Sequence, residues 1–380
     1  MTKQESLLLM AKRVGDTVRK MAGDGKSLYT PFMAAASNAV SQRIASVDFV
    51  LDLRDARIPL SSECELLRRL SSSSSSRRIV VLNKVDLASR SNVKEWTRYF
   101  ERESFPTFGV NSHNKDNIQE FLGFLQSQVR ALKKAEPERH TITMMLVGIP
   151  NVGKSALANS LHHIGRISAA EKGNLKHAVV SPIPGETKGI CSLKVASHPS
   201  IYILDTPGIL PPQLIDVEVC AKLALTGALR DNLAGEKALA QYFLSVLNFN
   251  HEYQKWEKLS TFELPNSGNN DNVLPRIGSF ENKTSTPEII TDHTQDSVVL
   301  SVRRSLFEAV TSFRGNLREE EELLRLIKAE FDVLKKAFKL PTGPEEDIEH
   351  KVAVKLLNLF RTGRLGHYIL DSIPVNIKDV

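Results

Sequence analysis

Residues 142–155 read ITMMLVGIPNVGKS, an apolar run that leads directly into a loop bounded by glycines. The octet from Gly148 to Ser155 fits the phosphate-binding pattern G-x-x-x-x-G-K-[ST], and the helical sequence SALANSLHHI completes the required strand-then-helix context. In this pattern backbone N–H groups surround the α- and β-phosphates, the lysine reaches the β- and γ-phosphates, and the hydroxyl binds magnesium. The predicted phosphate contacts are Asn151, Val152, Gly153, Lys154, Ser155 and Ala156, with Ser155 as a Mg²⁺ ligand.

Two later segments follow the phosphate loop at informative distances. The apolar run 201–204 ends at Asp205-Thr206-Pro207-Gly208, a D-x-x-G segment in which Asp205 would lie behind the magnesium ion and the Gly208 N–H would contact the γ-phosphate. The loop 181–190, SPIPGETKGI, contains Thr187, which we predict to bind both Mg²⁺ and the γ-phosphate. Ordinary turns are the alternative for both segments, and their positions after the phosphate loop favour the nucleotide role.

A base-reading motif occurs before the phosphate loop. Residues 80–88 read VVLNKVDLA, in which Asp86 can accept two hydrogen bonds from guanine that adenine cannot donate. Asn83 would support the loop, and the Lys84 stem would cover the base. The alternative is a strand end that happens to carry a lysine. Asn111 and Ser112, in the sequence GVNS, are placed like the loop that contacts the guanine O6, so the motifs run in a rotated order.

Composition limits the class of protein. The 380 residues carry a net charge of +6, and residues 1–140 hold 23 Lys and Arg against 16 Asp and Glu. A basic first third suits an anionic partner such as RNA, although a solvated surface is the simpler interpretation. Cys64, Cys191 and Cys220 lack disulfide or zinc-site spacing. We expect a soluble protein, because no apolar run reaches the roughly 20 residues that span a bilayer.

The order of elements predicts an α/β fold followed by helices. Strands are predicted at 47–51, 79–82, 142–148 and 201–204, and helices at 117–134, 213–229, 236–248, 299–313 and 317–340. We expect an N-terminal helical segment at 1–40, a nucleotide-binding domain at 41–215 and a helical C-terminal domain at 216–380. The polar segment 262–295 and the serine run 71–76 are predicted loops or disordered inserts. Residues 1–22 fit either a domain helix or an organelle-targeting segment.

The rotated motif order resembles that of the circularly permuted GTPases. Residues 52–59, DLRDARIP, look like the D-x-R-D-A-R-x-P signature of the DAR-type subfamily, and the resemblance continues in PGETKG, DTPGIL, LALTGAL (223–229) and FRTGRLG (360–366). It implies a P-loop GTPase domain that binds GTP and GDP with Mg²⁺. It also implies K⁺ held by Asn151 and hydrolysis that depends on Asn151, Lys154, Thr187 and Gly208.

One position departs from the family pattern. Phe32 stands where many relatives have a histidine. Ile209 follows D-T-P-G, where the resemblance implies the usual apolar residue of the family and many other GTPases have a water-orienting glutamine. Neither side chain can orient water, so hydrolysis is expected to be slow or assisted by a partner.

Three functions are compatible with the sequence. The family resemblance implies a GTP-hydrolysing factor that assists assembly of the large subunit of an organellar ribosome, with the mitochondrial matrix as the expected location and plastid or cytosol as alternatives. It implies a monomer off the ribosome and leaves a peripheral inner-membrane association open. The second function is a GTP-dependent RNA- or ribosome-binding module with negligible hydrolysis, and the third is a signalling switch unrelated to ribosomes.

Overall fold

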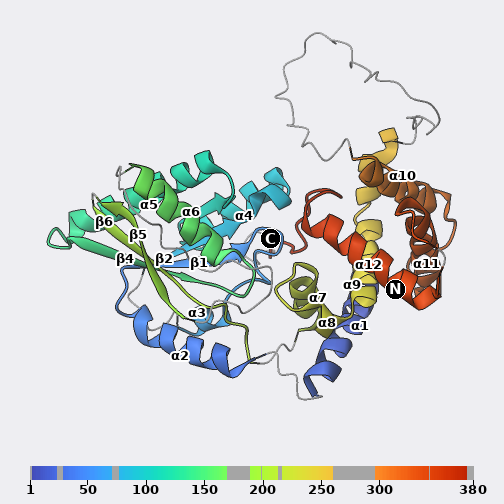
Figure 1. Cartoon of the computed structure of the whole chain (residues 1–380), viewed down its shortest axis with the longest axis horizontal. Coiled ribbons are helices and arrows are strands. Elements are labelled where there is room, and N and C mark those ends of the chain that lie inside the picture. Colours follow the sequence, from blue (N-terminus) through green and yellow to red (C-terminus); the bar gives the residue numbers. More distant parts are fainter. Residues whose placement is uncertain are drawn as a thin grey trace, which may run out of the picture.

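The computed structural model describes residues 2–23, 29–70, 77–168, 189–197, 199–212, 216–259, 296–341 and 343–374. Figure 1 shows two parts: one built on a β-sheet, called here the sheet half, and one made of helices, called the helical half. The serine run 71–76, the insert 262–295 and Thr187 lie outside the described residues. The predictions made for them stay predictions, as does the division into three domains.

The sheet has six strands in the order β3-β2-β1-β4-β6-β5. All neighbours pair in parallel except β5, which runs antiparallel to β6 at the edge. The strands are β1 Phe49–Asp55, β2 Arg77–Asn83, β3 Thr107–Val110, β4 Thr141–Val147, β5 Cys191–Ser197 and β6 Ser200–Asp205. The four predicted strands are therefore confirmed as β1, β2, β4 and β6, which are the apolar runs a buried parallel sheet requires.

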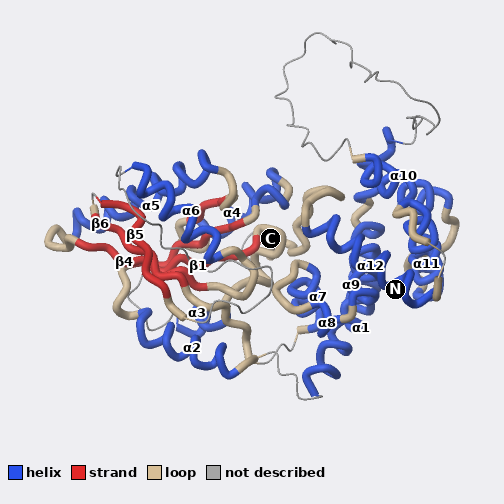
Figure 2. The backbone as a smooth tube through the Cα atoms, in the orientation of Figure 1, coloured by secondary structure: helices blue, strands red, loops and turns tan. Residues whose placement is uncertain are grey.

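Helices cover both faces of the sheet (Figure 2). On one face lie α4 (Arg90–Arg102), α5 (Lys115–Ala135) and α6 (Lys154–Ser168), and on the other lie α2 (Pro31–Ile44) and α3 (Glu65–Leu70). The apolar face predicted for 117–134 is confirmed, because its six members are buried in α5. Asn114 begins that helix by accepting a hydrogen bond from the Asn117 N–H, as an N-cap does.

The helical half combines the N-terminal helix with the C-terminal third of the chain. Its elements are α1 Lys3–Gly23, α7 Val217–Leu225, α8 Asp231–Ala234, α9 Glu236–Phe249, η2 Glu252–Leu259, α10 Ser297–Ser312, α11 Glu320–Ala337 and α12 Glu345–Arg361. Helix α1 packs against α7, α8 and α9, and its Met10, Val14 and Val18 are buried. Among the described helices, none is long and apolar enough to cross a membrane.

Helices α7 and α12 end in the same backbone arrangement, which explains the two T-G sequences. At the end of α7, Gly227 has φ +82° and its N–H bonds the Ala224 carbonyl, while the Ala228 N–H bonds the Leu223 carbonyl. At the end of α12, Gly363 has φ +73°, and the Arg364 N–H bonds the Leu359 carbonyl in the way that the Ala228 N–H bonds the Leu223 carbonyl. These are Schellman motifs, whose left-handed position favours glycine. LALTGAL and FRTGRLG are therefore helix ends.

The last described residues, 365–374, return to the sheet half. Asp371 accepts hydrogen bonds from the backbone N–H groups of Leu60 and Ser61 at 2.9 and 2.8 Å. Ile369 and Ile373 pack against the apolar cluster that holds Trp96 and Phe100. This C-terminal tail, residues 365–374, thus joins the end of the helical half to the loop after β1.

Candidate guanine-nucleotide site

The predicted nucleotide motifs meet at one edge of the sheet. Strands β1, β2, β3, β4 and β6 are parallel, so their carboxyl ends share that edge. The loops that leave them carry the DAR sequence, NKVD, GVNS, the phosphate loop and DTPG, in that chain order. Ligands of open parallel sheets bind outside the carboxyl ends of the strands. The rotated order in sequence is therefore a compact arrangement in space.

The phosphate loop has the backbone that its glycines permit. Asn151 and Gly153 have φ values of +60° and +95°, which turn the loop between β4 and α6. A Cβ at Gly153 would lie 2.3 Å from Asn83 Nδ2, and one at Gly148 would lie 2.5 Å from the Leu53 carbonyl oxygen. Because neither position has room for a side chain, β1, β2 and the loop approach one another more closely than other residues would allow.

Lys154 is buried inside the phosphate loop. Its Nζ donates a hydrogen bond to the Ile149 carbonyl at 2.8 Å. Burial lowers the pKa of Lys154 to about 8, and the Asp205 carboxylate acts in the opposite direction. A phosphate group would bring negative charge to this ammonium group and stabilise its charged form.

Ser155 and Asp205 form the part of the site that suits magnesium. The Ser155 Oγ donates a hydrogen bond to Asp205 Oδ2 at 2.7 Å. Burial raises the pKa of Asp205, and its Oδ1 is buried without a hydrogen-bond partner in the described part of the chain. Oxygen donors of this kind fit Mg²⁺, which would neutralise phosphate charge when bound. Gly208 lies against the phosphate loop, since a Cβ there would be 2.6 Å from Pro150 Cα.

NKVD contacts the phosphate loop directly. Asn83 is buried at the end of β2, and its Nδ2 donates to the Val152 carbonyl at 2.7 Å. Lys84 has φ +64°, and its Nζ donates to the Asn151 carbonyl at 2.6 Å. Asp86 is exposed in the short helix η1, Val85–Leu87. The carboxylate predicted to read guanine is thus open to solvent beside a lysine anchored to the phosphate loop.

The GVNS loop is joined to NKVD through Ser112. The buried Ser112 Oγ donates to Asn83 Oδ1 at 2.8 Å, so Asn83 uses both ends of its amide to hold two loops. Asn111 lies between β3 and α5, where its side-chain oxygen accepts from the His113 N–H. These contacts bring Asn83, Ser112 and Val152 together from three parts of the chain.

Comparison with known proteins identifies the family. The model of the family described as 50S ribosome-binding GTPase matches residues 143–267, which start at β4 and leave NKVD upstream of the match. The chain is 52% identical over 371 residues to the Arabidopsis thaliana protein "DAR GTPase 2, mitochondrial", covering 97% of each chain. The chain belongs to the DAR GTPase family of circularly permuted GTPases.

Two further relatives extend the comparison. "Short integuments 2, mitochondrial" of Arabidopsis thaliana is 39% identical over 350 residues, which cover 91% of this chain and 89% of that protein. "Ribosome biogenesis GTPase A" of Bacillus licheniformis is 32% identical over 237 residues, or 61% of this chain and 78% of that protein. As a DAR GTPase, the chain is a GTP-hydrolysing enzyme that uses GTP, GDP and Mg²⁺, and several of its relatives are named as mitochondrial.

The DAR sequence itself contributes contacts that the nucleotide motifs do not predict. Asp55 Oδ2 pairs with Lys84 Nζ at 3.0 Å and with Arg57 Nη2 at 2.7 Å. A signal for Asp55 is present in the sequence, because an acidic residue at the end of a parallel strand lies at the ligand-binding edge. The sequence-based prediction nevertheless includes Asp55 only within the DAR signature and gives it no role in the site.

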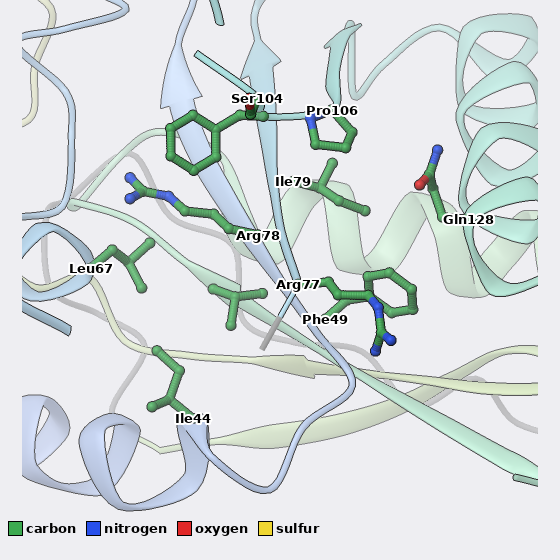
Figure 3. Close-up of a pocket in the computed structure, with 11 residues that line it drawn as sticks. Ile44, Phe49, Leu67, Arg77, Arg78, Ile79, Ser104, Pro106 and Gln128 are labelled. Carbon is green, nitrogen blue, oxygen red and sulfur yellow. The ribbon is translucent and has the colours of Figure 1, made fainter. Parts of the chain in front are cut away.

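A cavity of about 340 Å³ lies at the opposite edge of the sheet, where β1 and β2 begin (Figure 3). Its guanidinium groups are already paired: Arg78 contacts Asp52 at 2.6 Å, and Arg77 contacts Glu136 at 3.5 Å. The nucleotide motifs lie at the other edge, so this cavity does not belong to the DAR GTPase site.

Proposed function

We propose that this DAR GTPase binds guanine nucleotides at the carboxyl edge of the sheet and assists assembly of the large subunit of a mitochondrial ribosome. The observation that carries the site is the hydrogen bond from Asn83 to the Val152 carbonyl. It joins the early base motif to the late phosphate loop, as one nucleotide spanning both would require. The ribosomal role rests on relatives named "Ribosome biogenesis GTPase A" and "Mitochondrial ribosome-associated GTPase 1".

Each predicted residue has a role in this proposal. Asp86 reads the guanine edge, the Lys84 stem covers the base, and the Asn111–Ser112 backbone contacts O6. Lys154 neutralises the β- and γ-phosphates, while Ser155 and Thr187 hold Mg²⁺. Val152, Gly153 and Ala156 supply backbone N–H groups to the phosphates. Asp205 lies behind Mg²⁺, and the Gly208 N–H contacts the γ-phosphate.

Potassium is the proposed source of additional positive charge at the phosphates. The Asn151 Nδ2 donates a hydrogen bond to the Gly227 carbonyl at 2.8 Å, which fixes the orientation of this amide. An amide held in one orientation suits a cation ligand, because the ligand oxygen need not be ordered when the ion binds. Ile209 and Phe32 have uncharged hydrocarbon side chains, so neither supplies charge to the phosphates.

Hydrolysis would be transmitted to the helical half through the DTPG segment. Gly208 lies against Pro150, and the Ile209 N–H bonds the Gly148 carbonyl at 3.3 Å. The chain then continues through 213–215 into α7. Loss of the γ-phosphate contact at Gly208 can therefore alter how α7 is held. We propose that the protein is a monomer when it is off the ribosome and that its GTP-bound form docks on the large subunit in the matrix. A peripheral association with the inner membrane is part of the same proposal.

Turnover measurements test this proposal. GTP hydrolysis should be slow for the protein alone, and large mitochondrial subunits should accelerate it more in K⁺ than in Na⁺ at equal ionic strength. Acceleration by subunits without a K⁺ preference would remove the role given to Asn151. No acceleration in either salt would contradict an enzyme stimulated by the ribosome.

A GTP-dependent RNA- or ribosome-binding module with negligible intrinsic hydrolysis is the second candidate, favoured by Phe32 at the start of α2, whose side chain cannot orient water. Under this candidate, GTP loading increases co-sedimentation with large subunits while phosphate release stays at the level without subunits. Replacing Phe32 with histidine, the residue of many relatives, should then restore turnover. The matched control is Met33→His, one residue along the same helix.

A further inference from the structure

The C-terminal end of α7 is held by side chains from the DAR sequence, the phosphate loop and α12. The last carbonyls of a helix lack partners within the helix, and the Schellman motif of α7 satisfies only those of Leu223 and Ala224. The Leu225 carbonyl accepts from Arg361 Nε at 3.0 Å, and the Thr226 carbonyl accepts from Arg57 Nη2 at 3.3 Å. The next carbonyl, that of Gly227, accepts from Asn151. Thus the DAR sequence and the phosphate loop contact adjacent peptide groups of the helical half.

Arg57 also binds the carboxylate that holds the base-reading lysine. Its Nε and Nη2 contact Asp55 Oδ1 and Oδ2 at 2.9 and 2.7 Å, a bidentate pair whose side chains are only 2% and 3% exposed. Lys84 Nζ lies 3.0 Å from the same Asp55 Oδ2. On the other side, the guanidinium carbon of Arg57 lies 5.4 Å from the centre of the Phe360 ring in α12. Arg57 therefore touches the nucleotide site, α7 and α12.

We propose that Arg57 is a positioning residue that links the guanine-binding turn to the helical half through the path Lys84–Asp55–Arg57–Thr226. The inference rests on the proposed nucleotide site and adds a second connection to the one through DTPG. When a base holds Lys84 in place, Asp55 and Arg57 keep their geometry and the Thr226 carbonyl stays paired. By linkage, a partner that displaces α7 must then weaken nucleotide binding by the same factor.

The charges along this path depend on one another. Burial lowers the pKa of Lys84, and the nearby Arg57 acts in the same direction, while Asp55 opposes both. Without Arg57, Asp55 would have Lys84 as its remaining cation and would draw the ammonium group away from the Asn151 carbonyl. A bidentate guanidinium is required, since a lysine at 57 cannot bond both carboxylate oxygens and the Thr226 carbonyl in one plane.

A purely structural ion pair is the competing explanation, and the DAR sequence contains its matched control at the end of β1. Arg54 pairs with Asp52 at 2.8 Å, is 3% exposed, and lies 4.9 Å from the centre of the Phe100 ring. The Arg54→Met variant leaves Asp52 with Arg78, just as Arg57→Met leaves Asp55 with Lys84. No hydrogen bond or ion pair described for Arg54 reaches Lys84 or α7, so the two variants differ chiefly in the proposed link.

Dissociation of a fluorescent GDP analogue from the full-length protein gives the first test. Arg57→Met should speed release about tenfold, the value expected when a charged hydrogen bond is lost, whereas Arg54→Met should change it less than about threefold. Arg57→Lys should fall between wild type and Arg57→Met. Equal release rates for Arg54→Met and Arg57→Met would overturn the proposal. If the wild type bound no GDP, the proposed nucleotide site itself would fail.

Amide hydrogen exchange in the α7 turn gives a readout that a structural role would not move. Saturating GDP should slow exchange at residues 226–229 in wild type and Arg54→Met, but not in Arg57→Met. Because Arg57→Met leaves a buried carboxylate short of one partner, Phe360→Leu serves as a second variant that keeps the ion pair intact. It should also reduce the GDP-dependent protection. Protection that persists in both Arg57→Met and Phe360→Leu would contradict the link.

Discussion

The side-chain amide of Asn83 donates a hydrogen bond to the backbone carbonyl of Val152, 69 positions later in the chain, at 2.7 Å. Asn83 belongs to the first nucleotide motif and Val152 to the phosphate loop. Because parallel strands bring their carboxyl ends to one edge, the sheet can assemble this pair whichever motif comes first in the sequence. Rotating the motif order therefore preserves the proposed site and places the helical half directly after its last motif, DTPG.

Replacing Gly153 with alanine should abolish nucleotide binding. A Cβ would lie 2.3 Å from Asn83 Nδ2, and the φ of +95° is unfavourable for alanine. Gly123→Ala is the control, because Gly123 lies in α5 with nothing within 4 Å of the added Cβ. The control should raise the free energy of unfolding by about 0.5–1 kcal/mol and leave GDP affinity unchanged. Normal GDP binding by Gly153→Ala would show that the two loops do not need to touch.

GTP affinity should decrease as pH rises above about 8. In the free protein the pKa of Lys154 is lowered to about 8, and bound phosphates raise it, so binding above that pH must take up a proton. The decrease can reach tenfold per pH unit until the pKa of the complex is reached. Calorimetry at pH 8.5 in two buffers of different ionisation enthalpy measures this proton directly. Equal binding enthalpies in the two buffers would contradict the prediction.

The helical half should lose stability as pH rises toward 8. Burial between α9 and α11 raises the pKa of Glu330 from 4.5 to about 8, and the hydrogen bond from Asn248 only partly opposes this shift. The folded state therefore keeps a proton that the unfolded state releases. Between pH 4.5 and about 8 the free energy of unfolding falls by an amount on the order of a few kcal/mol. When urea unfolding is measured at pH 6 and at pH 8, Glu330→Gln should remove most of the difference between the two free energies of unfolding. The exposed Glu321→Gln on the same helix should retain it.

Asp371 should stabilise the contact between the C-terminal tail and the loop after β1. It accepts from the Leu60 and Ser61 N–H groups and pairs with Lys222 of α7 at 3.1 Å. Asp371→Ala should lower the free energy of unfolding by about 1–3 kcal/mol, because two backbone donors lose their acceptor. Ser372→Ala, a change at the neighbouring residue, should have little effect in the same denaturant titration. If Asp371→Ala and Ser372→Ala had the same denaturant midpoint of unfolding, Asp371 would not stabilise the contact between the tail and the loop.

The sequence predicts those strands that carry strong apolar runs. β1, β2, β4 and β6 are of this kind, whereas β3 has only four residues and β5, CSLKVAS, mixes polar and apolar residues at the sheet edge. The edge position explains the mixture, because one side of such a strand need not pair or be buried. Helix α12 has no counterpart among the predicted helices, although its buried residues follow helical spacing.

The nucleotide motifs predict a shared site, but the contacts to the helical half could not be predicted from them. Periodicity indicates which face of a helix is buried and does not indicate which distant helix it meets. Arg57 and Thr226 are 169 positions apart, and their hydrogen bond depends on how α7 ends and where its carbonyls point. The position of α1 in the helical half could not be predicted for the same reason, because its apolar face could pack against several different helices.

The rotated motifs are proposed to form one guanine-specific site, and competition binding to wild-type and Asp86→Asn protein measures that specificity. Wild-type protein should prefer GDP to XDP by about 100-fold or more, because the carboxylate accepts hydrogen bonds that xanthine cannot donate in the same way. Asp86→Asn should reverse this preference, while Asp116→Asn, a change at an exposed residue of α5, should keep it. Unchanged GDP affinity in a folded Asp86→Asn protein would show that Asp86 does not read the guanine base.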